Sequence, residues 1–139
     1  MGEQVVHFEV NAKSGKRARK FYGSLFDWKI NADNPMDYGL VNTGGKGVQG
    51  GIGQVDAGKP SYVTFYIGVD DPQKYLDRAV SLGGKVVLPL TRIPNMVTFA
   101  QFADPEGNVV GLVKNEMPRP ASATKSSAKK SSPKKKKRA

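Results

Sequence analysis

The sequence predicts an α+β domain made of two βαβββ modules, which form one curved eight-stranded mixed sheet with helices on its outer face. The first observation is a repeat: the strand-like quartet His-Phe-Glu-Val at 7–10 recurs as Thr-Phe-Tyr-Ile at 64–67, and each quartet begins a segment in which a strand runs into a helix. The second is that each segment closes with a hairpin strand that begins with the pattern Gly-x-x-x-Gly, at 47–53 and 107–113. One module alone would leave an apolar sheet face uncovered, so the two are expected to pack edge to edge.

The first module predicts a strand, a helix and three short strands. Residues 4–11 alternate as a strand does, and Ser14 is the expected N-cap of a helix over 15–26. The apolar residues at helical spacing in that helix are Ala18, Phe21, Tyr22 and Leu25. The remaining strands are expected at 28–30, 38–43 and 47–54.

The second module repeats that order after a linker over 56–60. A strand is expected at 62–69, and Asp70-Asp71-Pro72 is expected to cap a helix that ends at Gly83-Gly84. The apolar side of that helix would hold Tyr75, Leu76, Ala79, Val80 and Leu82. The last three strands are expected at 85–88, where Pro89 breaks the strand, at 96–103 and at 108–114, with a turn over 104–108.

Composition divides the chain into a domain over 1–116 and a basic tail over 117–139. The domain holds all 12 acidic and 13 of the 22 basic residues, so its net charge is +1, whereas the tail holds nine basic residues and no acidic one. Residues 118–139 of the tail contain no aromatic and no large aliphatic residue, which predicts disorder because they cannot bury enough apolar surface to offset the ordering entropy. The chain has no cysteine, which excludes disulfides, thiolate metal sites and cysteine nucleophiles.

The tail is expected to contact nucleic acid or another polyanion. Its clustered cations are Lys129, Lys130, Lys134, Lys135, Lys136, Lys137 and Arg138. Such contacts would be non-specific, because sequence readout needs an ordered scaffold that reaches the bases. The alternative is a tail that only aids solubility. No run of eighteen apolar residues predicts a membrane span and no signal-like segment begins the sequence, so a cytoplasmic location is expected, or a nucleoid-associated or nuclear one through the tail.

The concave face of the predicted sheet is the expected ligand site. Because side chains alternate along a strand, His7 and Glu9 share one face, and Thr64 and Tyr66 share the matching face of the second module. With Gln49, these four residues are the expected ligand-binding set. Glu9 and Tyr66 are also candidate catalytic residues, as a carboxylate base and a phenol proton donor that need no metal.

The segment 45–50 matches the dinucleotide fingerprint G-x-G-x-x-G, but a different structure is expected there. That motif needs a helix immediately after it to receive the phosphates, and here Gly51-Ile52-Gly53 and a linker follow instead. The segment therefore predicts a glycine-rich hairpin whose glycines leave room on the concave face for a ligand or for a partner's side chain.

Several motifs together resemble the vicinal oxygen chelate superfamily, which includes glyoxalases, bleomycin-resistance proteins and extradiol dioxygenases. The resemblance covers about residues 4–115. It rests on the quartet at 7–10, Phe21-Tyr22, Gly50-Gly51-Ile52-Gly53, Val69-Asp70-Asp71 and the turn over 104–108. It implies the same two-module fold, and a homodimer is expected.

The resemblance also implies where a metal would bind. Metal-dependent members of that superfamily supply ligands from the first and last strands of each module. His7 matches the first such position, but the others are Thr64, Gly51 and Gly111. Since His7 is the only histidine and a metal usually needs three protein ligands, the favoured hypothesis is a small-molecule-binding domain without a cofactor. The alternatives are a lyase or dioxygenase that holds zinc, nickel or iron through non-standard ligands, and a non-enzymatic DNA-associated accessory protein.

Overall fold

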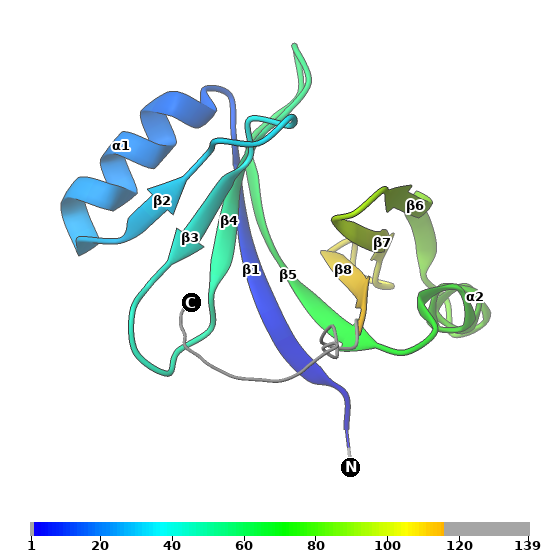
Figure 1. Cartoon of the computed structure of the whole chain (residues 1–139). Coiled ribbons are helices and arrows are strands. Elements are labelled where there is room, and N and C mark those ends of the chain that lie inside the picture. The colour runs from blue at the N-terminus through cyan, green and yellow to red at the C-terminus, as the bar shows by residue number, and fades with distance from the viewer. Residues whose placement is uncertain (1, 116–139) are drawn as a thin grey trace.

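A computed structural model describes residues 2–115, and it confirms the predicted α+β fold. The ten elements in chain order are β1 (Gln4–Ala12), α1 (Gly15–Phe26), β2 (Lys29–Asn31), β3 (Gly39–Asn42), β4 (Gly50–Gln54), β5 (Tyr62–Val69), α2 (Pro72–Ser81), β6 (Lys85–Ile93), β7 (Val97–Ala103) and β8 (Val109–Lys114). One eight-stranded sheet has the strand order β2-β3-β4-β1-β5-β8-β7-β6. The sheet curves strongly, with α1 and α2 at its two ends (Figure 1).

The two modules join through the first strand of each. β1 pairs antiparallel with β5, so that His7 lies opposite Tyr66 and Glu9 lies opposite Thr64. On the other side of each central strand, β4 pairs parallel with β1 and β8 pairs parallel with β5. This equivalence confirms the repeat read from the sequence. A register shift between Val5 and His7 interrupts the β1–β5 ladder just before the polar residues of β1.

The helices begin where the sequence predicts. The Ser14 hydroxyl accepts a hydrogen bond from the Arg17 amide at 3.2 Å, and the Asp71 carboxylate accepts one from the Lys74 amide at 3.2 Å. Each bond satisfies an amide that the first turn of a helix leaves without a partner. Gly83 ends the second helix with a φ of 102°, a conformation that favours glycine.

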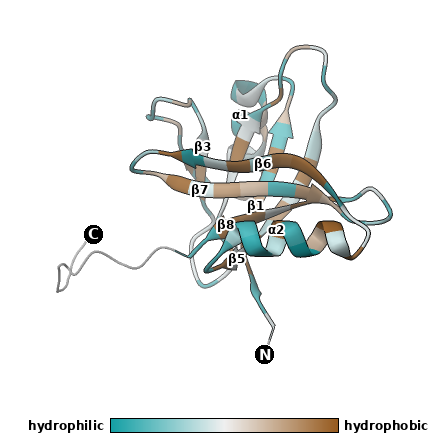
Figure 2. Ribbon diagram, turned by 90° about the vertical axis from the view of Figure 1, so that its right-hand side faces the viewer, coloured by the Kyte–Doolittle hydropathy of each residue, from teal (hydrophilic) through white to brown (hydrophobic). Residues whose placement is uncertain are grey.

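The apolar core lies between the helices and the outer face of the sheet. Beside α2, the core consists of Val69, Leu76, Ala100 and Leu112. Beside α1, aromatic rings fill the same place: Trp28 lies 5.8 Å from Tyr22 and 5.4 Å from Phe8 between ring centroids. The visible side of α2 is mostly hydrophilic in Figure 2, while brown apolar segments run along β6 and β7.

Each helix buries less of its apolar side than predicted. Phe21 and Leu25 of α1 are each 58% exposed, and Leu82 after α2 is 70% exposed, with Val80 also exposed. Helical spacing identifies an apolar side but not how much of it a curved sheet can cover. The sheet bends away from each helix, so only the residues nearest the strands lose contact with water.

The prediction that Pro89 ends a strand was wrong, because β6 continues from Lys85 to Ile93. Two features make proline acceptable there. The strand lies at the edge of the sheet, so one of its sides has no neighbour. The ladder between β6 and β7 also shifts register between Leu88 and Thr91, so Pro89 falls at an irregularity where it has no paired residue on β7.

The predictions for the basic tail concern residues that lie outside the described range. Within residues 2–115, neither helix is long and apolar enough to cross a membrane.

The composition of the core predicts how much stability is lost when a leucine side chain in or beside α2 is shortened to alanine. Leu76→Ala removes a side chain that is 2% exposed, and we expect it to lower the free energy of unfolding by about 3 kcal/mol, measured by urea denaturation. Leu82→Ala makes the same chemical change at the exposed end of the helix, and it should cost less than about 0.5 kcal/mol. Equal losses in the two variants would contradict the assignment of the core.

Candidate functional site

A buried carboxylate lies at the centre of the concave face. Glu9 is 9% exposed and accepts hydrogen bonds from three side chains. Its Oε1 accepts from Asn11 Nδ2 at 2.8 Å and from the Tyr66 hydroxyl at 3.3 Å, and its Oε2 accepts from the Tyr38 hydroxyl at 2.7 Å. Three converging donors suit an ionised carboxylate, which can only accept. No cation forms a salt bridge with Glu9 in the described part of the chain, so these neutral donors carry the stabilisation of its charge.

The hydrogen bonds run in one direction, toward Glu9. The Tyr38 hydroxyl has one proton and gives it to Glu9, so it must accept from His7 Nε2, which lies 2.9 Å away. The Tyr66 hydroxyl likewise gives its proton to Glu9 and accepts from Gln101 Nε2 at 2.9 Å. His7 is therefore protonated on Nε2, and its Nδ1 is the ring atom that remains for a ligand.

Burial keeps the aromatic members of this cluster neutral. Loss of solvation lowers the pKa of His7, and the charge of Glu9 opposes that effect only in part. Burial also raises the pKa of Tyr38 and of Tyr66 well above the ordinary phenol value, and the Glu9 charge raises both further. Tyr66 therefore holds its proton firmly, which suits a hydrogen-bond donor better than a group that releases a proton.

The two tyrosine rings occupy space that glycines leave open. A Cβ atom added to Gly51 of β4 would strike the ring and hydroxyl of Tyr38, and one added to Gly111 of β8 would strike the ring of Tyr66. In both cases the added Cβ atom would lie far closer to the ring than non-bonded atoms can approach. The expectation that glycines leave room on the concave face is thus met at Gly51, but a tyrosine of the same chain fills that room instead of a ligand or partner.

These residues do not fit the metal site that the resemblance implies. Gly51 and Gly111 supply no donor atom, and the tyrosine rings leave no room for a longer side chain. The hydroxyl of Thr64, the fourth position, donates to the Val109 carbonyl oxygen at 2.7 Å. In residues 2–115, no three His, Cys, Asp or Glu side chains gather closely enough to hold a metal ion. The Nε2 atom of His7 is engaged in its hydrogen bond with the Tyr38 hydroxyl at 2.9 Å.

Four of the five predicted ligand-binding residues meet at this cluster. His7, Glu9, Thr64 and Tyr66 lie together across β1 and β5. Gln49 does not join them: its side-chain oxygen accepts from the Thr43 amide at 2.6 Å within the β3–β4 connection. The strand predicted from residue 47 begins only at Gly50, which leaves Gln49 in the connection just before β4.

Sequence reasoning missed three members of the cluster, for different reasons. Asn11 stands two residues after Glu9, and strand alternation would have placed it on the same face. Gln101 follows from the same rule on β7 once that strand is placed beside β8. Tyr38 precedes β3, in a β2–β3 connection that is longer than its counterpart between β6 and β7, so the repeat does not point to it. Asn34 fixes that connection by donating to the Tyr38 carbonyl oxygen at 2.7 Å and accepting from the Tyr38 amide at 3.0 Å.

The glycine-rich segment that matches the dinucleotide fingerprint is a hairpin connection. Gly44 and Gly45 have φ values of 75° and 73°, as a tight turn between two strands requires. β4 follows, so no helix N-terminus is available to bind phosphates.

Comparison with known proteins places this geometry in a family. The family model described as "Glyoxalase/Bleomycin resistance protein/Dioxygenase superfamily" matches residues 4–112. A Mycobacterium tuberculosis protein named "Putative glyoxylase CFP32" is 34% identical in an alignment of length 104 that covers 68% of this chain and 39% of that protein. The chain thus spans about two fifths of the length of this curated relative. A "Glyoxylase-like domain-containing protein" of Didymella fabae is 29% identical over 76% of this chain and 88% of its own length.

Solved structures agree on the fold. A superfamily member from Vibrio splendidus aligns with a TM-score of 0.55 at 17% identity, covering 82% of this chain and all of its own. Methylmalonyl-CoA epimerase from Mycobacterium tuberculosis aligns with a TM-score of 0.60 at 15% identity, covering 81% of this chain and 88% of its own. At these identities the likeness establishes the arrangement of the strands and not the chemistry.

The close packing of the Tyr38 ring on Gly51 predicts that a side chain at position 51 lowers the stability of the fold, and that removing the ring restores part of the loss. Gly51→Ala should destabilise the fold by about 2 kcal/mol, because the new methyl group meets the Tyr38 ring. In a double-mutant cycle measured by urea denaturation, Tyr38→Ala should recover at least about 1 kcal/mol of that loss. The control is Gly47→Ala, whose new atom would come no nearer than 3.9 Å to Thr43 Oγ1 and should be close to neutral. Simple additivity of Gly51→Ala and Tyr38→Ala would refute this packing.

Proposed function

Because the chain belongs to the Glyoxalase/Bleomycin resistance protein/Dioxygenase superfamily, we propose that its concave face binds a small organic ligand without the metal that many members of that superfamily use. The single observation that carries the proposal is that tyrosine rings occupy the space above two strand positions, 51 and 111. Where the resemblance calls for metal ligands, Gly51 and Gly111 stand beneath the rings of Tyr38 and Tyr66. The same rings hold Glu9 through their hydroxyl groups, so the polar centre of the face is organised by hydrogen bonds instead of by a cation.

The cluster favours an uncharged ligand that can both donate and accept hydrogen bonds. His7 is only half-buried, and its Nδ1 has no hydrogen-bond partner among the described residues, so it can accept from a ligand. Tyr62 is exposed, and its oxygen accepts from Gln101 Nε2 at 3.3 Å, which leaves its proton for a ligand acceptor. An anionic ligand is disfavoured because the nearby Glu9 charge would repel it.

Thermal melting of protein purified without chelator tests the proposal. We expect no loss of melting temperature in EDTA, and no stoichiometric zinc, nickel or iron by elemental analysis, since the donor set is incomplete. In a panel of small neutral compounds that each carry a hydroxyl and a carbonyl group, binders should raise the melting temperature, and His7→Ala should abolish that rise.

Gln49→Ala is the matched control, because it removes a polar side chain that the structure places outside the cluster. It should leave the binding unchanged. Tightly bound metal that is lost in His7→Ala would overturn the proposal and favour the metal-dependent enzyme. A panel without any binder that depends on His7 would also count against it.

We also propose that the basic segment after the domain contacts nucleic acid or a similar polyanion. The observation in favour is the separation of charge: residues 1–116 carry a net charge of +1, and all nine basic residues of 117–139 stand without an acidic one. Neutralising phosphates releases counterions, so affinity of this kind falls steeply with salt.

A gel-shift series with one DNA duplex at increasing salt tests that second proposal. The full chain should bind with a log–log salt slope as steep as about −8, because nine cations are available. A 1–116 truncation, which retains the complete described sheet, should lose nearly all binding. Equal binding by the two proteins would refute a role for the basic segment and point to the basic side chains of α1.

A further inference from the structure

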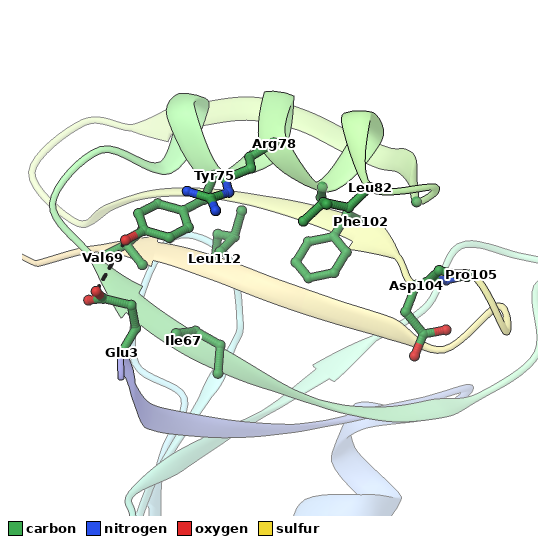
Figure 3. A pocket seen from close by; sticks show the side chains of 12 residues that line it. Glu3, Ile67, Val69, Tyr75, Arg78, Leu82, Phe102, Asp104, Pro105 and Leu112 are labelled. Carbon is green, nitrogen blue, oxygen red and sulfur yellow. Dashed lines mark hydrogen bonds between the residues drawn. The ribbon is translucent and has the colours of Figure 1, made fainter. Parts of the chain in front are cut away.

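A groove runs along the outer face of the second module, between α2 and the sheet, with a volume of about 450 Å³. Figure 3 shows Ile67 and Leu112 on its floor, Leu82 and Phe102 further along, and Tyr75 with Arg78 at one end. Asp104 and Pro105 close the other end. The size lies within the range of small-molecule sites. The groove is on the opposite face of the sheet from Glu9, so it is separate from the concave site.

The sequence of α2 explains why the groove stays open. Leu76 fixes the helix to the core, while Tyr75, Ala79 and Leu82 follow the side that faces the groove. Ala79 has too small a side chain to fill the space between Tyr75 and Leu82. The main chain turns at Gly84, where an added Cβ atom would lie 2.7 Å from the Ala103 carbonyl oxygen, so no side chain closes the groove from that end either.

The charged groups around the groove differ in their partners. Asp104 is satisfied within its own turn, where it accepts from the amides of Glu106 and Asn108 at 2.9 Å each and from Asn108 Nδ2 at 2.9 Å. Glu3 accepts from the Tyr75 hydroxyl at 3.1 Å. Arg78 forms no salt bridge with any residue from 2 to 115. At the end where Tyr75 lies, the described residues thus offer one guanidinium that forms no salt bridge, and the Glu3 carboxylate at the same end is bonded to the Tyr75 hydroxyl.

We propose that this groove binds an amphipathic organic monoanion, such as a medium-chain carboxylate, with its head group on Arg78 and its apolar body along Ile67, Leu112 and Phe102. Arginine matches the geometry of a carboxylate with two parallel hydrogen bonds. The negative charge of Asp104 at the far end disfavours a second anionic group there. The inference does not rest on the function proposed for the concave face, which favours an uncharged ligand.

The comparable groove of the first module is a less suitable site for such a ligand. It lies between α1 and the sheet, and its lining combines Val10, Phe21 and Val63 with the polar groups of Lys13, Ser14, Arg17 and Ser61. Its cations are spread along the rim, whereas the groove beside α2 has a single cation above an apolar floor. A monoanion with one apolar chain matches the second arrangement.

Calorimetric titration of the full chain with sodium octanoate, and with octanol as the neutral analogue, tests the proposal. Octanoate should bind saturably, and Arg78→Gln should weaken it by roughly tenfold while changing octanol binding less than twofold, because only the charge-assisted bonds are lost. Ala79→Leu should weaken both ligands by filling the groove. Lys74→Gln, which removes the same charge from the outer surface of α2, should leave both unchanged.

Three results would overturn the proposal. The first is a folded protein that binds no octanoate. The second is equal loss in Arg78→Gln and Lys74→Gln, which would indicate a general charge effect. The third is a pair of observations: the original chain binds no octanoate but forms a dimer in sedimentation, and Ala79→Leu loses that dimer. This result would assign the groove to a second copy of the chain. His7→Ala should bind octanoate as the original chain does. The proposal for the groove and the proposal for the concave face can therefore fail independently of each other.

Discussion

The carboxylate of Glu9 is the constraint on which the middle of this protein depends. Removing an ionised carboxylate from water costs several kcal/mol unless hydrogen-bond donors replace the water. Asn11, Tyr38 and Tyr66 supply those donors from β1, the β2–β3 connection and β5. His7 and Gln101 then supply protons to the two tyrosine oxygens. A single charge thus ties together both modules and gives each hydroxyl group one orientation.

The same constraint explains the glycines of β4 and β8. Large side chains cover β4 on both faces, with Phe8 over Gly50 on the outer side and Tyr38 over Gly51 on the concave side. Positions 50 and 51 of the strand therefore have no room for side chains of their own. Glycine costs conformational entropy in a strand, and here the packing of rings and the satisfaction of Glu9 offset that cost. The glycine-rich hairpin predicted over 45–50 therefore leads into a tightly packed strand from Gly50 onward.

The extent to which sequence predicts this structure depends on how local each feature is. The repeat, the caps at Ser14 and Asp71 and the polar faces of β1 and β5 all follow from short-range periodicity and hydrogen bonding. Tyr38 does not, because its position beside Glu9 depends on how the β2–β3 connection, which is longer than its β6–β7 counterpart, folds across β4. Pro89 was misjudged because its tolerance depends on the edge position of β6, a property of the whole sheet. Curvature is likewise a property of the assembled sheet, and it decides how much of Phe21 and Leu25 remains in water.

The interlocking of ring and glycine also limits how this domain can change. A substitution that introduces a metal-ligating side chain at position 51 or 111 meets a tyrosine ring already in that space. Removing the ring first leaves Glu9 short of a donor, so either single step is unfavourable and only the paired change avoids both penalties. Directed evolution toward metal-dependent chemistry on this scaffold would therefore need libraries that vary 38 with 51, or 66 with 111, at the same time.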